Sequence, residues 1–216
     1  EGERGVLIFE DREITNVELD RAARKLGNAL LGLGVKRGDR VILQMPNCPE
    51  VLECFGAAWR MGAVIVPINY LIGEEETAYI YQDSGAKVVV SSLTFLPKIQ
   101  AGLQKAPDVK TVILLEKDVP SEMFSYNQFI DHTQEDATIA ETEDDDIAAL
   151  IYTSGTTGKP KGVIHTHRSL YANARMSYET ISLPDDLTSV SVLPLCHSYG
   201  IANINNGLFR TGRTVL

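Results

Sequence analysis

Apolar residues along the chain alternate between short β-branched runs and longer stretches with helical spacing. Two early runs, 6–10 and 13–14, predict strands around a turn at Asp11-Arg12. A helix to about Leu33 follows, because Thr15 to Glu18 has the spacing of a capping box and Gly34 is a typical helix stop. The predicted apolar face of this helix is Val17, Ala22, Leu26, Ala29, Leu30 and Leu33.

The same alternation continues to the end of the chain. Further strands are predicted at 40–45, 63–67, 87–90, 111–115, 147–153, 162–166, 189–195 and 213–216. Helices are predicted from 47 to Gly62 and at 74–83, 95–105, 169–181 and 199–209. Strands that alternate with helices indicate βαβ units. The predicted fold class is therefore α/β, with a largely parallel sheet or sheets flanked by helices on both faces.

One segment interrupts this pattern. Residues 133–145 are polar, acidic and poor in large apolar groups, which predicts a solvated connector. It divides the chain into a first α/β portion, 1–132, and a second, 146–216, which contains a loop rich in glycine, threonine and lysine. Because the last residues have the pattern of a strand, we expect that more protein follows Leu216.

Charge excludes one class of partner. The net charge is −9, and ten acidic residues lie between Asp118 and Gly158, where Lys and Arg are absent. The global acidity argues against nucleic-acid binding. It does not argue against a small anionic ligand, which responds to fields within a Debye length of about 8 Å.

Cysteine and hydropathy patterns bear on location. The three cysteines form no CxxC pair, which favours reduced thiols in a cytoplasmic protein. We expect no transmembrane segment, because no apolar run approaches the roughly 18 residues that cross a bilayer. No signal-peptide pattern is visible at the start of the sequence.

The informative stretch runs from Thr153 to Lys161, directly after an apolar strand. It holds four hydroxyls, two glycines and two lysines, in the order Thr153, Ser154, Gly155, Thr156, Thr157, Gly158, Lys159, Pro160, Lys161. Glycines let the backbone approach a ligand, and successive N–H groups can form an anion-binding nest. Hydroxyls and lysines add donors and positive charge. Each hydrogen bond to a charged group contributes roughly 1.5–3 kcal/mol, so several could hold a triphosphate.

Two other interpretations of this loop are a P-loop and a hairpin that binds no ligand. A P-loop needs four residues between its glycines and then Lys-Ser/Thr at the start of a helix. Here two residues separate Gly155 from Gly158, and Pro160 follows Lys159, so this pattern fits poorly. A glycine–threonine hairpin without a ligand remains open, although the clustered lysines favour an anion.

The run TSGTTGKPKGV resembles the signature loop of adenylate-forming enzymes: acyl- and aryl-CoA synthetases, luciferases and peptide-synthetase adenylation domains. Other similar stretches are GDRVILQMPNCPE (38–50), GAVIVPINY (62–70), DSGAKVVV (83–90) and LPLCHSYG (193–200). The resemblance implies the N-terminal subdomain of an enzyme that works in two steps. The carboxylate of an acid attacks the α-phosphate of ATP to give acyl-AMP and pyrophosphate, and the thiol of CoA then displaces AMP to give acyl-CoA.

The resemblance also implies residue roles. Thr153 to Gly158, with Lys159 and Lys161, would cradle the β- and γ-phosphates. His197, by itself more often a satisfied polar residue, would be the catalytic aromatic gate beside the carboxylate and α-phosphate, and Tyr199 and Gly200 would line the same pocket. No Asp lies between His197 and Asn206 to hold an ammonium group, so a fatty or aryl acid is expected rather than an amino acid.

Some parts of the family pattern are not found in this sequence. There is no Tyr-Gly-x-Thr-Glu run, whose Glu would bind Mg²⁺, and no Thr-Gly-Asp run for the ribose. We therefore expect the Mg²⁺ ligand outside this chain, and we expect the isolated chain to be inactive. His165 and His167 lack further ligands nearby and are interpreted as structural, so no metal site is predicted. The alternative function is a non-catalytic nucleotide- or acyl-binding module.

Overall fold

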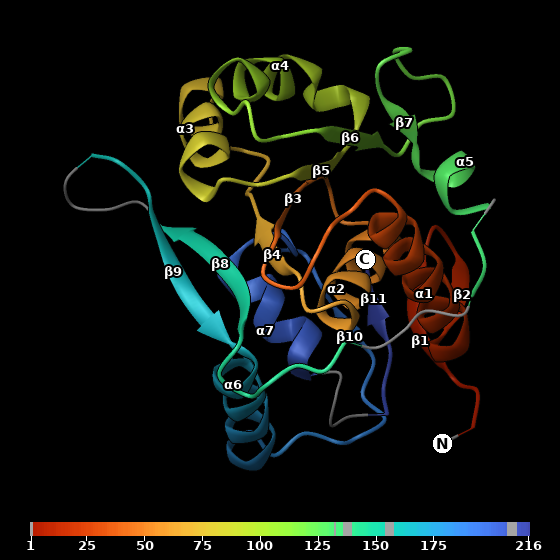
Figure 1. Cartoon of the computed structure of the whole chain (residues 1–216). Helices are drawn as coiled ribbons and strands as arrows, with labels where there is room; N and C mark the ends of the chain where they lie inside the picture. The colour runs from red at the N-terminus through yellow and green to blue at the C-terminus, as the bar shows by residue number, and fades with distance from the viewer. Residues whose placement is uncertain (1, 132, 136–139, 154–157, 207–210) are drawn as a thin grey trace.

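The computed structural model describes residues 2–131, 133–135, 140–153, 158–206 and 211–216. Its strands form two sheets, one of seven strands and one of four (Figure 1). The predicted α/β class with mostly parallel strands is confirmed.

The larger sheet has the strand order β7-β6-β5-β3-β4-β8-β9. Every neighbouring pair is parallel except β8 and β9, which form an antiparallel hairpin. The strands are β3 (Arg40–Gln44), β4 (Val64–Pro67), β5 (Val88–Ser91), β6 (Thr111–Leu114), β7 (Phe124–Ser125), β8 (Ile147–Thr153) and β9 (Lys161–Thr166).

Helices cover both faces of this sheet. In β3, Val41 and Leu43 belong to one core cluster and Ile42 to the other, because successive side chains of a strand point to opposite faces. The first cluster includes residues of α1 (Asn16–Gly32) and α2 (Pro49–Arg60). The second includes residues of α3 (Glu74–Ser84) and α4 (Leu96–Lys105), which follows the short 3-10 turn η1 (Leu93–Phe95) (Figure 1).

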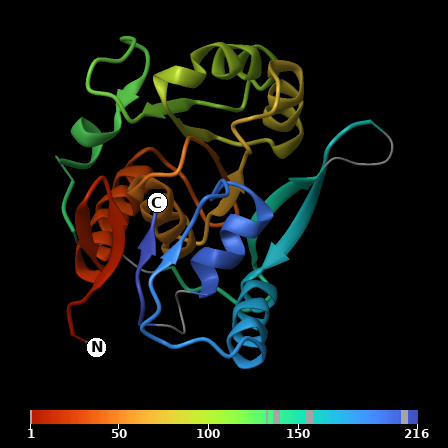
Figure 2. The same cartoon turned by 180° about the vertical axis from the view of Figure 1, so that it is seen from behind.

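The smaller sheet has the order β10-β11-β1-β2. It joins β1 (Gly5–Phe9) and β2 (Arg12–Thr15) to β10 (Ser189–Val190) and β11 (Thr214–Val215). Seen from behind, α7 (Ser198–Asn206) and the strands β10 and β11 lie between α1 and the β8–β9 hairpin (Figure 2). Both sheets contain strands from before and after residues 133–145, and the division into two portions at this segment stays a prediction.

The start of α1 is as predicted, but its buried face is partly different. Thr15 and Glu18 form a capping box, with Thr15 Oγ1 accepting from Glu18 N at 3.1 Å. The buried residues of the helix are Ala23, Leu26, Gly27 and Leu30, whereas Val17 is 39% exposed and Leu33 38%. Small residues form the contact with α2: a Cβ at Gly56 would lie 3.0 Å from the Cβ of Ala23. This close approach selects the buried side of α1.

Three further expectations need correction. The first turn is centred on Glu10 and Asp11, at φ values of 48° and 62°, rather than on Asp11-Arg12. The predicted strand at 189–195 is only Ser189–Val190, because beyond Ser191 the backbone of Leu193 and Leu195 is hydrogen-bonded to the side chain of Asn47 instead of to a strand. The sequence patterns also missed β7 and α5 (Tyr126–Asp131). The expected helix at 169–181 is α6 (His167–Thr180).

All three cysteines are free and buried. Within the described part of the chain, no helix is both long and apolar enough to cross a membrane.

Candidate active site

The predicted phosphate loop connects the two strands of the β8–β9 hairpin. Thr153, the last residue of β8, and Lys161, the first of β9, are cross-strand partners. Ser154, Gly155, Thr156 and Thr157 lie outside the described residues. The chain continues after the loop as the extended strand β9, as expected, so no helix begins directly behind it.

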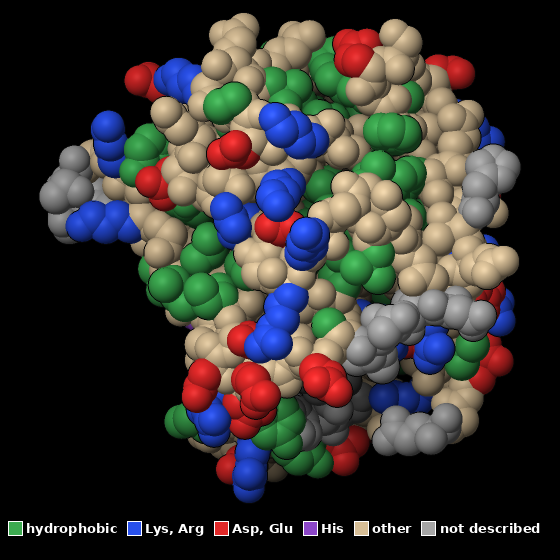
Figure 3. Space-filling model, viewed as in Figure 1, with side chains coloured by type: hydrophobic (Ala, Val, Ile, Leu, Met, Phe, Trp, Pro, Cys, Tyr) green, Lys and Arg blue, Asp and Glu red, His purple; other side chains and the backbone are tan. Residues whose placement is uncertain are grey.

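The described end of the loop carries exposed positive charge. Lys159 and Lys161 are both exposed, and basic side chains lie at the outer end of the hairpin, on the left of the view (Figure 3). Gly158 has a φ of 87°, a conformation that side-chain-bearing residues rarely adopt. The two ammonium groups are therefore available to an anion from solvent.

A hollow of about 360 Å³ lies at the carboxyl ends of β4 and β8. Thr153 and His197 both line it, although they are far apart in the sequence. In open α/β sheets, ligands bind at the carboxyl ends of strands, and this hollow has that position. The complete lining is Pro67, Ile68, Asn69, Ile72, Glu76, Ile80, Ile151, Tyr152, Thr153, Cys196, His197 and Ser198.

His197 lies at the turn that leads into α7. Its backbone N–H donates to Pro194 O at 3.0 Å, its carbonyl accepts from Ile201 N at 3.1 Å, and its ring Nδ1 is 3.4 Å from Ser198 Oγ. The side chain is exposed, while Cys196 beside it is buried in the core. A fixed backbone with an exposed ring suits a residue that contacts a ligand.

Asn47, which follows the end of β3, holds the segment before His197. Its Nδ2 donates to Leu193 O at 2.9 Å, and its Oδ1 accepts from Leu195 N at 2.8 Å. A side chain from the sheet therefore satisfies backbone groups that would otherwise need a strand partner.

Of the two residues predicted beside His197, Gly200 is the one whose surroundings are described. Gly200 is buried, and a side chain there would overlap the backbone of Leu195, so glycine allows α7 to start this close to the preceding turn. Gly200 is not among the residues that line the 360 Å³ hollow. The side chain of Tyr199 lies outside the described part. Substrate contacts by either residue stay predictions.

A second hollow, of about 700 Å³, lies between α3, the end of α4 and residues 158–160. Its lining includes Lys159 and shares Glu76 with the hollow beside His197. The full set is Gly73, Glu75, Glu76, Tyr79, Gln82, Lys105, Gly158, Lys159 and Pro160. The two described ends of the loop thus border neighbouring hollows that are separated by α3.

Two further histidines of the described part, His165 and His167, lie at the end of β9 and at the start of α6. Burial lowers the pKa of both His165 and His167, which favours their neutral forms, and His167 packs edge-on against Trp59 with ring centroids 6.4 Å apart. Among the described residues, no group of three His, Cys, Asp or Glu side chains could hold a metal ion. His132 lies outside the described residues.

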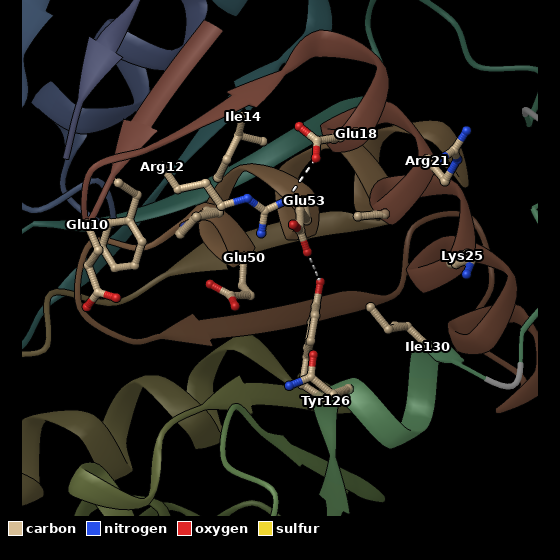
Figure 4. Close-up of a pocket in the computed structure, with 14 residues that line it drawn as sticks. Glu10, Arg12, Ile14, Glu18, Arg21, Lys25, Glu50, Glu53, Tyr126 and Ile130 are labelled. Carbon is tan, nitrogen blue, oxygen red and sulfur yellow. Dashed lines mark hydrogen bonds and ion pairs between the residues drawn. The ribbon is translucent and has the colours of Figure 1, made fainter. Parts of the chain in front are cut away.

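A third hollow, of about 620 Å³, is formed by the β1–β2 hairpin, α1, the start of α2 and α5 (Figure 4). Arg12 Nη2 lies 2.8 Å from Glu18 Oε1, and the Tyr126 hydroxyl donates to Glu53 Oε2 at 2.6 Å. Burial raises the pKa of Glu53 to about 7. This hollow contains none of the predicted site residues, so its charged groups are separate from the candidate active site.

Sequence reasoning missed several residues around the site. Asn47, Asn69 and Glu76 were not singled out, although Asn47 and Asn69 fall within stretches that resemble the adenylate-forming enzymes. A possible signal is position: Asn47 and Asn69 follow the buried strands β3 and β4 almost directly, where parallel strands end at one edge of the sheet.

The described geometry combines three chemical features. A hairpin carries exposed lysines, a hollow beside it joins Thr153 to His197, and isoleucines line part of the same hollow. An anion with an attached apolar group could contact all three.

Comparisons with known proteins agree with this geometry. A family model described as "AMP-binding enzyme" matches residues 1–216. A crotonobetaine/carnitine–CoA ligase of Salmonella enteritidis PT4 is 32% identical over 207 residues, covering 91% of this chain and 40% of that protein. The chain thus spans well under half the length of the curated relatives it matches.

Solved structures give the same picture. The anthranilate CoA ligase AuaEII in complex with anthranoyl-AMP superposes with a TM-score of 0.94 at 28% identity, over 99% of this chain and 42% of that one. ATP-bound MatB from Rhodopseudomonas palustris superposes with a TM-score of 0.86 at 26% identity, again over 99% of this chain and 42% of the other.

Proposed function

Because this chain belongs to the AMP-binding enzyme family, we propose that it supplies the phosphate loop and the acyl-side histidine of an ATP-dependent acid–CoA ligase. The observation that carries the proposal is the single hollow lined by both Thr153 and His197. It brings the start of the loop and the proposed gate to the carboxyl ends of adjacent strands, β4 and β8.

The first step requires two anions, a carboxylate and ATP, to meet. In the proposal, Lys159 and Lys161 reduce the repulsion between them, and the loop hydroxyls and N–H groups hold the β- and γ-phosphates. Positioning and charge neutralisation are the main contributions of a protein to such phosphoryl chemistry. The carboxylate oxygen then bonds to the α-phosphorus, the bond to the bridging oxygen breaks, and pyrophosphate leaves.

His197 is proposed to border the reacting carboxylate on the acyl side. Its backbone is hydrogen-bonded on both sides, so the ring can shield the reacting atoms from water without a change in the main chain. Transfer of the acyl group to CoA, with AMP as leaving group, completes the proposed reaction.

The proposed substrate is a fatty or aryl acid. Support comes from Ile68, Ile72, Ile80 and Ile151, which line the hollow beside His197. The relatives named above act on different acids: crotonobetaine and carnitine in one case, and anthranilate in another. A substrate panel therefore has to include charged as well as uncharged acids.

The test is ATP–pyrophosphate exchange by the protein of the complete reading frame. We expect exchange that depends on added acid, with octanoate or benzoate more effective than carnitine or an amino acid. The isolated 216-residue chain is expected to show none. If the complete protein binds ATP but catalyses no exchange with any acid, the proposal is wrong and the non-catalytic binding module is favoured.

A further inference from the structure

The loop end of the β8–β9 hairpin contacts α3. Tyr79 and Asp83 lie one turn apart on this helix, and both contact residues next to the glycine–threonine–lysine loop. Tyr152, which precedes Thr153, donates its hydroxyl to Asp83 Oδ2 at 2.6 Å, and Tyr79 donates to Asp83 Oδ1 at 3.2 Å. Lys159 Nζ lies over the ring of Tyr79, 5.4 Å from its centroid. One carboxylate thus connects both described ends of the loop.

The direction of the Tyr152 side chain follows from its partner across the hairpin. Tyr152 pairs with Gly162, and a Cβ at Gly162 would lie 3.1 Å from the tyrosine ring. The ring therefore covers Gly162, and the hydroxyl extends beyond it to Asp83. Burial, followed by the hydrogen bond to Asp83, raises the pKa of Tyr152 well above its usual range, so the hydroxyl remains a donor at neutral pH.

Within its own helix, Asp83 accepts the exposed hydrogen bond from Tyr79, an i,i+4 pair of the kind that stabilises a helix only slightly. It is the penultimate residue of α3, and an acidic side chain in the last turn is unfavourable to the helix dipole. The residue is also exposed, so it contributes little to the core. Its side chain instead accepts hydrogen bonds from the two tyrosines beside the loop.

We propose that Asp83 is a positioning residue for the nucleotide loop, acting through Tyr152 on one side and through Tyr79 and Lys159 on the other. Because Tyr152 and Lys159 are already held in place, these two residues lose less freedom when phosphate binds. The inference rests on the proposed function, because it assigns ATP to this loop. It also gives a role to the first residue of the stretch DSGAKVVV, which the loop itself does not explain.

The test compares Asp83→Ala with Glu74→Ala, which removes the same charge from the exposed first turn of α3. In the complete enzyme, we expect Asp83→Ala to raise the KM for ATP about three- to tenfold, as for the loss of one ordinary hydrogen bond. The KM for the acid and the thermal midpoint should change little, and Asp83→Asn should recover part of the effect. Glu74→Ala should resemble the wild type.

A second measurement does not depend on ATP. Hydrogen exchange of the 216-residue chain should show faster exchange in peptides spanning 150–162 for Asp83→Ala and for Tyr152→Phe. The double variant should exchange little faster than either single variant, because both changes remove the same hydrogen bond between Tyr152 and Asp83. Equal exchange in wild type, Asp83→Ala and Glu74→Ala would overturn the proposal, as would equal losses in every kinetic constant. Loss of the proposed function is a separate result: the wild-type complete protein would then show no ATP–pyrophosphate exchange.

Discussion

Asn47 and Leu195 are joined by a hydrogen bond of 2.8 Å between the asparagine Oδ1 and the leucine backbone N–H, two residues before His197. The same asparagine also holds Leu193 O through its Nδ2, at 2.9 Å. The position of His197 therefore depends on a residue at the end of β3, in the first part of the chain.

Replacing Asn47 with Ala should destabilise the chain and disturb the site. The contacts with Leu193 and Leu195 are lost, and we expect a loss of about 1–3 kcal/mol in the free energy of unfolding because backbone groups are left unpaired. Urea denaturation measures this change. Asn127→Ala, an exposed position on α5, is the control and should be close to neutral. Equal stability of both variants would show that the contacts with Leu193 and Leu195 are unimportant.

Replacing Lys161 with Ala should weaken adenylation in the complete enzyme. A lost charge-assisted contact corresponds to about 1–3 kcal/mol in kcat/KM for ATP, and we expect the same range for Thr156→Ala. The measurement is ATP–pyrophosphate exchange, with the exposed Lys36→Ala as the matched control. Unchanged kinetics in both loop variants would exclude the loop from the active site.

Replacing His197 should separate the shape of its ring from its polarity. We expect His197→Ala to lower kcat/KM for the acid about 10- to 100-fold, or about 1.4–2.7 kcal/mol, because the hollow loses one wall. His197→Phe, which keeps a ring, should retain more activity. Thermal midpoints should be nearly equal, since the side chain is exposed. If both variants match the wild type, His197 is not the gate.

Glu53 should make stability depend on pH. Burial raises its pKa in the folded state to about 7, from its ordinary value of 4.5. The folded state then binds the proton more tightly, so this contribution is fully present below pH 4.5 and is lost as pH rises through 7. The contribution of Glu53 to the free energy of unfolding is on the order of 2–3 kcal/mol.

Urea denaturation between pH 4.5 and 8 tests this dependence. Glu53→Gln should remove the decline while keeping an acceptor for the Tyr126 hydroxyl, and should therefore be the more stable protein at pH 8. Glu122→Gln, on the exposed surface, should follow the wild-type profile. Identical slopes for wild type and Glu53→Gln would contradict the raised pKa.

Local sequence patterns predicted much of this fold. The capping box at Thr15 and Glu18, the glycine at position 34 and the apolar runs of β3 to β6 depend on neighbours a few residues away, so periodicity and turn chemistry were sufficient. The loop after β8 was recognisable for the same reason: its glycines, hydroxyls and lysines are contiguous.

Only the tertiary structure decided which residues surround that loop. Asp83 and Tyr152 are 69 positions apart, and Asn47 and Leu195 are 148 apart. Their contacts depend on the order β5-β3-β4-β8 in the sheet and on how closely α3 approaches the hairpin, and no local pattern contains this information. Polar residues at strand and helix ends follow no periodicity, so their roles become visible only when the sheet brings those ends together.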